Sequence, residues 1–350
     1  MAPILLHANQ PPDGFYAGGA RISTLRGAAS CASYQPEDWV ASTTCCRGSE
    51  GVGLSKLPDG RLLRDAVASE PERWLGPAHV AKHGGGGDTK LLVKLLDAGQ
   101  RLPVHAHPHV DWAARHLAAR HGKAEAWYVL TPGSVWLGLR DGFDGAGELR
   151  RLVLDGDGDG EALLARMHKV DVVPHQSVYV PPGVLHCLGE GVMVVEVQEP
   201  EDMSVLCEWK GFRINGRKEG HLGLGFDVAL TAVETRARTR EQIMELVKDS
   251  QASTSSSDGS SVVVDASREY FELERRRVVA GAQQRCRRGF AVVIVLGGAV
   301  SLAVDARHDG GGDDGGLALS KGATVVVPFA DGDFVLEGDG ADVLIARPPQ

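Results

Sequence analysis

Three histidines and one glutamate have the residue types and the spacing of a transition-metal shell. His105 and His107 stand two apart in an extended stretch, Glu125 opens a second apolar stretch, and His186 follows a third. Residues two apart on a strand point to the same face of a sheet, so both imidazoles of the first pair can reach one ion. Burying such groups without partners would be costly. The pattern therefore predicts a metal site with His105, His107, Glu125 and His186 as its ligands.

The chemistry of this donor set narrows the choice of ion. Imidazole with one carboxylate suits zinc, iron, manganese, nickel or copper better than calcium or magnesium. A set of core histidines without metal is the alternative interpretation. It has to explain why all four groups gather at the ends of predicted strands.

The elements that must position these residues are mostly short strands separated by Gly and Pro. Strands are expected at 91–96, 126–130, 134–139, 177–180 and 191–198, and a helical insertion at 110–121. Ser69 is expected to cap a short helix that ends at Leu75. The acidic glycine run Asp155–Gly160 is expected to be a solvated hairpin loop, because it lacks the glutamate that ends a calcium-binding loop.

The length of 350 residues favours more than one domain. We expect a metal-binding β-barrel domain at 1–222 and a helical segment at 223–250, where Thr239 and Gln242 resemble a capping box. A polar linker or loop at 251–261 and a second barrel at 262–350 follow.

The tail is expected to be a weak repeat of the first barrel. Its strands are expected at 269–274, 291–296, 299–304, 323–327, 333–337 and 341–346, and 323–328 parallels 177–181. Near Asp333, the tail has no counterpart of His186, and its histidine, His308, falls in a glycine-rich loop. We therefore expect the second barrel to bind no metal.

Composition excludes several classes of function. The net charge of −9 leaves no basic stripe for a nucleic-acid partner. No stretch reaches the roughly 18 apolar residues of a membrane span, and the apolar start is too short for a signal peptide. The six cysteines are scattered, without a Cys-x-x-Cys pair. These features predict a cytoplasmic protein in a reducing environment.

Two jelly-roll barrels with metal in the first only form the arrangement known as a bicupin. At this level the chain resembles the class I mannose-6-phosphate isomerases, which are zinc-dependent aldose–ketose isomerases. The matching segments are Leu92–Ala98, Pro103–Pro108, Gly122–Tyr128 and Val180–His186, together with Glu37–Ser42 near the N-terminus. The resemblance implies a mainly β fold of two cupin (jelly-roll) barrels with a helical segment between them.

Carried onto this sequence, the metal shell of the family falls on His105, His107, Glu125 and His186, with zinc as the expected ion. His105 stands where the family has glutamine, which keeps a ligand. Leu206 stands where the family has an arginine that is thought to assist enediol chemistry. Lys210 and Arg213 lie nearby in the sequence, and we expect Arg213 to be a catalytic residue that replaces this arginine.

The resemblance also implies the reaction, which is the interconversion of mannose 6-phosphate and fructose 6-phosphate through a cis-enediol. Lys94 and Lys123 are the candidates for the base or the charge stabiliser, because burial beside a cation disfavours a charged lysine. Glu196 and Gln198 alternate on one strand and are expected to line the same cavity. Lys210, Arg213, Arg217 and Lys218 could meet the phosphate of the sugar. We expect a monomer or a homodimer.

Two other functions fit the same residues. Three histidines and one carboxylate also bind ferrous iron, so an iron dioxygenase is compatible with the metal shell. A non-catalytic sugar-binding bicupin is compatible with Leu206. The block Gly122–Glu125 and the helical segment before the linker favour the isomerase over both.

Overall fold

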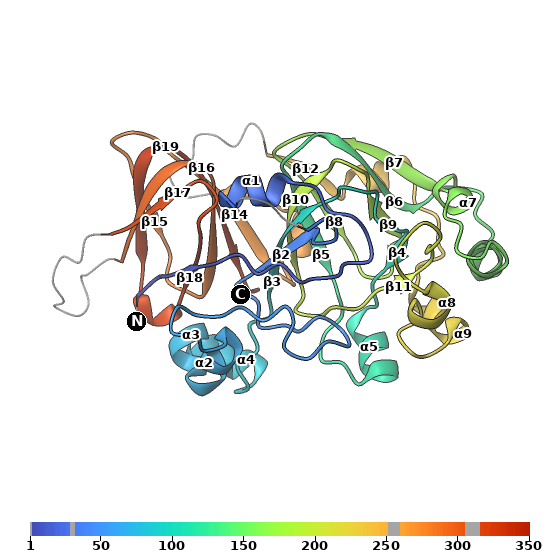
Figure 1. Cartoon of the computed structure of the whole chain (residues 1–350), viewed down its shortest axis with the longest axis horizontal. Coiled ribbons are helices and arrows are strands. Elements are labelled where there is room, and N and C mark those ends of the chain that lie inside the picture. The colour runs from blue at the N-terminus through green and yellow to red at the C-terminus, as the bar shows by residue number, and fades with distance from the viewer. Residues whose placement is uncertain (1, 29–31, 251–259, 305–315) are drawn as a thin grey trace.

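The computed structural model describes residues 2–28, 32–250, 260–304 and 316–350. Most of the predicted linker at 251–261 therefore lies outside the described residues. His308 also lies outside them. Figure 1 shows two β-rich regions side by side, with short helices along their edges. The mainly β fold expected from the sequence is confirmed.

Within the described residues, the strands form three antiparallel sheets of eight, six and five strands. The six-stranded sheet has the order β12-β8-β5-β10-β3-β2, and the five-stranded sheet has the order β11-β4-β9-β6-β7. Together they make up the region that carries the predicted ligands. Their strands are β2 Glu37–Val40, β3 Leu92–Asp97, β4 His105–Ala106, β5 Glu125–Val129, β6 Gly133–Leu139, β7 Met167–Val172, β8 Gln176–Val180, β9 His186–Leu188, β10 Met193–Gln198, β11 Val205–Leu206 and β12 Val247–Asp249.

The eight-stranded sheet forms the C-terminal region. Its main path is β1-β18-β16-β19-β14-β13, with β15 on β19 and β17 on β16. The strands are β1 Ile4–Leu6, β13 Ser260–Ser261, β14 Glu272–Val278, β15 Gln283–Cys286, β16 Ala291–Val304, β17 Leu317–Ser320, β18 Thr324–Val327 and β19 Phe334–Arg347.

Two pairs of strands predicted in the tail are single long strands. The stretches 291–296 and 299–304 both belong to β16, and 333–337 and 341–346 both belong to β19. The pairing of β16 with β19 shifts register around Gly297, as in a β-bulge. A bulge bends a strand without ending it. The glycines near the middle of β16 and β19 therefore interrupt the apolar pattern of the sequence but do not end the strands.

The helices are short and lie outside the sheets. They are α1 Arg21–Arg26, α2 Leu63–Ser69, α3 Pro71–Leu75, α4 Pro77–His83, α5 Val110–Leu117, α6 Gly145–Arg150, α7 Glu161–Leu164, α8 Gly216–Glu219, α9 Phe226–Ala229 and α10 Arg240–Met244, with a π-helical turn at Arg151–Asp155 and 3-10 turns at Leu230–Ala232, Asp265–Ser267 and Phe329–Asp331. No helix of the described residues is long and apolar enough to span a membrane.

Several local predictions can be compared with these helices. The capping box is confirmed, because Thr239 and Gln242 exchange side-chain hydrogen bonds with each other's backbone N–H groups. The predicted cap at Ser69 is wrong: Ser69 ends α2, and α3 begins at Pro71, whose missing N–H suits a first helical turn. The loop predicted at 155–160 begins within the π-helical turn and continues as a series of turns between β6 and β7.

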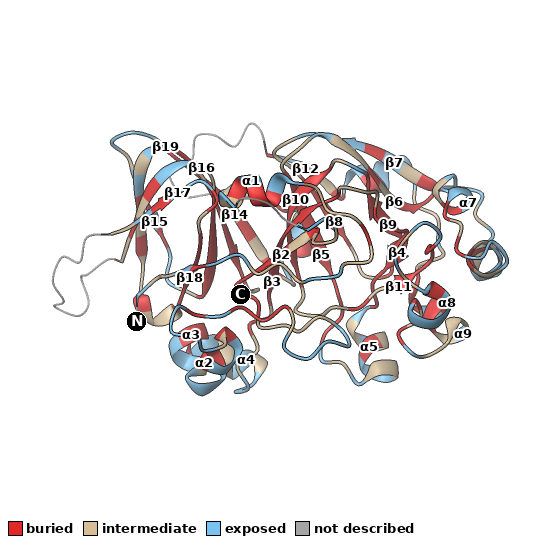
Figure 2. Ribbon diagram, in the orientation of Figure 1, coloured by how far each residue is buried: buried red, intermediate tan, exposed pale blue. Residues whose placement is uncertain are grey.

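The N-terminal segment ties the two regions together. β1 pairs with β18 of the C-terminal sheet, and the guanidinium of Arg26 donates to Gly322 O and Thr324 Oγ1. One core of buried apolar side chains runs through both regions, and Leu273, Val292 and Leu344 of the C-terminal sheet belong to it. Figure 2 shows buried residues along the strands of both regions and exposed residues along the outer helices.

Candidate metal centre and active site

The three predicted histidines converge between the two sheets of the first region. The ligand atoms of His105, His107 and His186 all lie within 4.8 Å of one another, and all three residues are buried. Register explains the convergence: His105 of β4 stands directly opposite His186 of β9. Glu125, at the start of β5 in the facing sheet, completes the group: its carboxylate oxygens lie 3.0 Å from His107 Nε2 and 3.2 Å from His186 Nε2.

Backbone carbonyls orient the three rings. The Nδ1 atoms of His105, His107 and His186 each lie 2.8 Å from a carbonyl oxygen, those of Pro103, Met203 and Val184 respectively. An Nδ1–H that donates to a carbonyl leaves Nε2 without a proton, which is the tautomer that binds metals; the Nε2 lone pair of His107 faces the ammonium of Lys123.

The protonation states also suit a metal. Burial and the neighbouring histidines lower the pKa of His105 well below its ordinary value. Burial and Lys123 lower the pKa of His107 to about 3. Burial alone would raise the pKa of Glu125, but Lys123 and the histidines outweigh it and hold this pKa well below its ordinary value. Neutral imidazoles and an ionised carboxylate are the forms that bind divalent cations.

Two further observations show that the residues present fit a divalent cation. His186 Nε2 and Glu125 Oε2 are buried and make no well-oriented hydrogen bond, although buried polar atoms normally have one; their polar neighbours lie at ion-pair distance only. The pocket is lined by four carboxylates, of Glu37, Glu125, Glu196 and Asp202, and by two ammonium groups, of Lys94 and Lys123. By residue type this is a surplus of two negative charges, which a divalent cation would neutralise.

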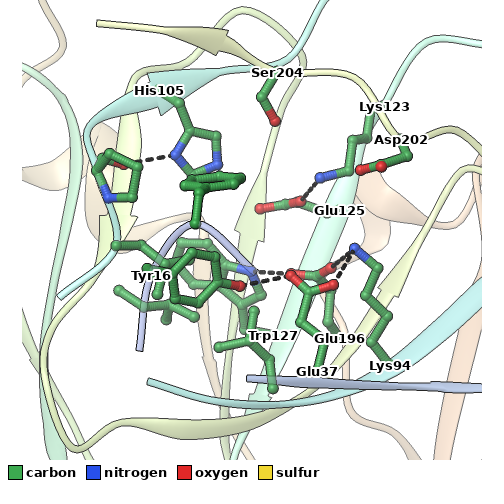
Figure 3. A pocket seen from close by; sticks show the side chains of 15 residues that line it. Tyr16, Glu37, Lys94, His105, Lys123, Glu125, Trp127, Glu196, Asp202 and Ser204 are labelled. Atoms are coloured by element: carbon green, nitrogen blue, oxygen red, sulfur yellow. Dashed lines mark hydrogen bonds and ion pairs between the residues drawn. The ribbon is translucent and has the colours of Figure 1, made fainter. Parts of the chain in front are cut away.

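The same pocket holds both predicted lysines. Lys123 Nζ lies 3.1 Å from Glu125 Oε2 and 2.8 Å from His107 Nε2. Lys94 Nζ lies between two carboxylates, 3.3 Å from Glu37 and 3.5 Å from Glu196. Figure 3 shows Lys94, Glu37 and Glu196 on one wall of the pocket, and Lys123, Glu125 and Asp202 on another.

The structure contradicts the expected electrostatics of Lys94. The sequence suggested that burial would disfavour its charged form. Burial does lower the pKa, but the carboxylates of Glu37 and Glu196 outweigh it, so the pKa of Lys94 is raised. Lys94 therefore stays an ammonium at neutral pH and is a poor candidate for a base.

The two carboxylates beside Lys94 differ from each other. Lys94 and the hydrogen bonds from Tyr16 and Trp39 outweigh burial and lower the pKa of Glu37. Burial and Glu125 raise the pKa of Glu196, which accepts one hydrogen bond of 3.1 Å from Trp127. Carboxylates whose environments separate their pKa values are typical of sites that move protons.

Comparison with known proteins shows which proteins the chain is similar to. No family model matches the chain. It is 30% identical over 186 residues to a probable mannose-6-phosphate isomerase of Bacillus subtilis, which is 53% of this chain and 55% of that protein. It is 25% identical over 271 residues to a mannose-6-phosphate isomerase of the same organism, which is 76% of this chain and 78% of that protein.

The resemblance to the class I mannose-6-phosphate isomerases is confirmed. Solved structures of such isomerases share the fold along the whole chain. The Bacillus subtilis mannose 6-phosphate isomerase matches with a TM-score of 0.72 and 20% identity, covering 99% of this chain and 100% of that one. A variant of the Salmonella typhimurium phosphomannose isomerase matches with a TM-score of 0.74 and 15% identity, covering 100% of both chains.

Leu206, at the position where the family resemblance places an arginine, lies close to the proposed ligands. Leu206 stands opposite His105 in the pairing of β11 with β4, so the two side chains share a face of the sheet. Leu206 is buried and does not belong to the residues that line the pocket.

The basic residues that follow Leu206 lie outside the pocket lining. Lys210 pairs with Asp159 at 2.7 Å, and Arg217 pairs with Asp157 at 2.7 Å. The guanidinium of Arg213 stacks on the ring of Tyr34, with its central carbon 4.1 Å from the ring centre. The backbone N–H of Arg213 donates to the carbonyl of Phe15, which does line the pocket. Arg213 is thus near the site but is not brought together with the lysines.

Sequence reasoning missed Glu37 and Tyr16 as parts of the site, and it overestimated Gln198. Glu37 was noted only within a family block, although a glutamate opening a short apolar strand was a signal. Tyr16 gave no signal, because it lies in an irregular segment. Gln198 donates to the carbonyls of Glu199 and Glu201 and is not in the pocket lining.

Proposed function

We propose that this protein is a divalent-metal-dependent aldose–ketose isomerase that interconverts mannose 6-phosphate and fructose 6-phosphate. The observation that carries the proposal is that three buried histidines converge on one point beside a pocket in which a lysine lies between two carboxylates whose pKa values are shifted in opposite directions. The mannose-6-phosphate isomerases to which the chain is similar support the choice of substrate.

His105, His107, Glu125 and His186 would hold the metal, and we propose zinc, which binds nitrogen and oxygen donors of this kind. When bound, such an ion acts as a Lewis acid that polarises a carbonyl oxygen. The rest of the chemistry concerns the residues of this chain. The reaction moves one proton from C2 to C1, and another from the C2 hydroxyl to the carbonyl oxygen, through a cis-enediol.

Glu196 is the group we assign to the transfer between the two carbons. Its raised pKa brings it closer to neutrality than an ordinary glutamate, which suits a carboxylate that must both take and return a proton. Lys94 stays charged and lies 3.5 Å from Glu196, so it would hold negative charge as the enediol forms. Lys123, on the other wall, would do the same near the metal ligands.

Arg213 stays a prediction. Released from Tyr34, its exposed side chain could meet the phosphate of the substrate outside the pocket lining. We also propose that the protein works in the cytoplasm as a monomer or a homodimer, in keeping with the cysteines of the described residues, all of which are free.

A coupled assay with mannose 6-phosphate tests the proposal. Zinc-reconstituted protein should form fructose 6-phosphate, and the same protein treated with a chelator should not. Readdition of zinc to the chelated sample should restore the rate, which controls for damage by the chelator. Bound zinc without any turnover would contradict the proposed function and would direct the search to other substrates.

A further inference from the structure

Tyr16 projects into the pocket from an irregular segment that is fixed on both sides. Before it, the N–H of Gly14 donates to Tyr34 O, and after it, the N–H of Gly18 donates to Ser33 O. The next residue, Gly19, touches Asp97 so closely that a Cβ there would meet its carboxylate at 2.2 Å. These contacts hold the ring of Tyr16 against the pocket with 4% of its surface exposed.

Among the residues that the structure describes, the hydroxyl of Tyr16 has one hydrogen-bond partner, the carboxylate of Glu37. It donates to Glu37 Oε1 at 2.6 Å, while Glu37 Oε2 accepts a hydrogen bond of 2.7 Å from Trp39 and faces Lys94 Nζ at 3.3 Å. Figure 3 shows this line, from the Tyr16 hydroxyl through Glu37 to the Lys94 ammonium, along one wall. The phenol oxygen keeps a lone pair that the sugar could use, since its proton points at the carboxylate.

The reaction needs a step before any proton leaves carbon. An aldohexose phosphate is mostly a closed hemiacetal ring, whereas the enediol forms only from the open aldehyde. Opening the ring removes the proton of the O1 hydroxyl, breaks the bond between C1 and the ring oxygen O5, and places a proton on O5. A site that acts on the ring form must therefore offer one proton acceptor and one proton donor close together.

We propose that Tyr16 and Glu37 are a catalytic dyad for ring opening, with Lys94 as the proton donor that completes the circuit. The O1 proton passes to the phenol oxygen of Tyr16 as the phenol proton passes to Glu37. The ammonium of Lys94 gives a proton to O5 as the bond from C1 to O5 breaks. Glu37 passes its proton to Lys94 in the same concerted relay, so Lys94 is never left as a free amine: one proton enters at Tyr16, one leaves at Lys94, and the protein keeps its starting state.

The arrangement separates this step from the isomerisation step. Glu37, which bonds Tyr16, belongs to β2, and Glu196, assigned above to the transfer between carbons, belongs to β10; these strands flank β3, which carries Lys94. One lysine can thus serve both steps in turn, as a donor toward O5 and as a cation for the enediol. This inference rests on the proposed function, because it concerns the same substrate in the same pocket.

Tyr16→Phe tests the dyad, since it removes the hydroxyl and keeps the ring. Tyr128→Phe is the matched control: Tyr128 is also a buried tyrosine, but its hydroxyl meets His175 and it does not line the pocket. With the zinc-loaded protein, we expect Tyr16→Phe to lower kcat for mannose 6-phosphate about 100-fold. The control should keep kcat within about twofold of the unmodified protein.

The deuterium isotope effect at C2 distinguishes a ring-opening role from a structural one. When ring opening becomes the slowest step, breaking the C2 bond no longer limits the rate. The isotope effect of Tyr16→Phe should then fall toward one. Glu37→Gln, which can accept the hydrogen bond but not the proton, should show the same fall.

Each outcome bears on a specific claim. A Tyr16→Phe protein with unchanged kcat overturns the dyad. So does a protein that loses activity while its isotope effect stays at or above that of the unmodified protein, because Tyr16 would then act through the geometry of Lys94. If the unmodified, zinc-loaded protein has no turnover at all, the proposed function fails and the dyad fails with it.

Discussion

The two β-rich regions are both built from antiparallel strands, but they use their interiors differently. Between its sheets the first region holds histidines, carboxylates and lysines around a pocket. The interior of the C-terminal region is closed by apolar side chains, among them Val293, Phe334, Leu336 and Val343. The same kind of antiparallel strand therefore serves as a frame for chemistry in one region and as packing in the other.

The turns that follow β8 in the first region and β18 in the second show how the two regions come to differ. In the first region, β8 is followed by Pro181 and, five residues later, by His186, which points at the other ligands. In the second region, β18 is followed by Pro328 and then by Phe329. The ring of Phe329 lies so close to Gly76 that a Cβ there would meet it at 2.6 Å. At this turn, one region delivers a ligand and the other anchors a helix.

Removing a ligand should have the largest effect and would make the interior of the first region chemically more like that of the second. Changes to residues that only support the ligands weaken metal binding roughly 10- to 100-fold. We expect His186→Ala, which removes a proposed ligand, to weaken it more than this and to abolish isomerisation. Metal content after dialysis and the coupled assay measure this. The exposed His7→Ala is the control and should keep both metal and activity. Full activity in His186→Ala would refute the ligand assignment.

Lys94→Met should show how much the polar interior depends on its charge balance. The change leaves Glu37 and Glu196 buried without their shared cation, and we expect it to lower the free energy of unfolding by about 3–5 kcal/mol at pH 7. Because burial already raises the pKa of Glu196 and Lys94 opposes that rise, the variant should raise this pKa further.

The pH dependence of that variant provides the check. A carboxylate with a raised pKa in the folded protein favours folding when protonated, so the loss of stability should shrink as pH falls through that pKa. Urea unfolding at several pH values measures this. In the unmodified protein, the rate should fall on the acid side as Glu196 is protonated, with a midpoint above the ordinary glutamate value of 4.5. A stability loss that does not change with pH would contradict this charge balance.

Substitutions in β19 can sharpen the boundary between the two interiors. Leu344 belongs to the core shared with the first region, and its neighbour Ile345 belongs to the separate core of the C-terminal region. Each change to alanine should cost about 2–5 kcal/mol, because both side chains are fully buried. We expect neither variant to change metal content.

The unfolding transitions of these two variants show whether the two regions unfold as one cooperative unit or as two. With a shared core, Leu344→Ala should still unfold in a single transition followed by fluorescence and by circular dichroism. Separate transitions for the two regions in the unmodified protein would contradict the role given to the shared core.

Arg213→Ala should have the smallest effect. An exposed cation near a phosphate contributes about 1 kcal/mol or less, so the KM for mannose 6-phosphate should rise about fivefold or less while kcat stays the same. The effect should shrink at high salt. Lys210→Ala is the control, because Lys210 is already paired with Asp159. Equal effects of the two changes would remove the reason for assigning Arg213 to the site.

The predictable part of the site depended on local sequence. The ligands sit on or beside short apolar strands, and the strand period alone places His105 and His107 on one face. The pairing of His105 with His186 required only that those strands meet. Lys94 was found for the same reason, within β3.

What sequence could not provide was the surroundings of those residues. The pKa of Lys94 depends on Glu37 and Glu196, which reach it from β2 and β10 across the sheet. The position of Tyr16 depends on hydrogen bonds from its neighbours to Ser33 and Tyr34, which lie in an irregular segment before β2. In the tail, the strand pairing of β16 with β19 shows that both strands continue past their glycines, which the sequence alone could not show.

The attachment of β1 to β18 has a consequence for the order in which this protein can mature. All four proposed metal ligands have been synthesised by residue 186, long before β18. Tyr16, however, lies between β1 and Arg26, and both are fastened to residues 322–326. Contacts between such distant parts of a chain form late in folding. On the ribosome, the four proposed ligands could thus come together before the two ends of the segment that carries Tyr16 are fastened to the C-terminal sheet.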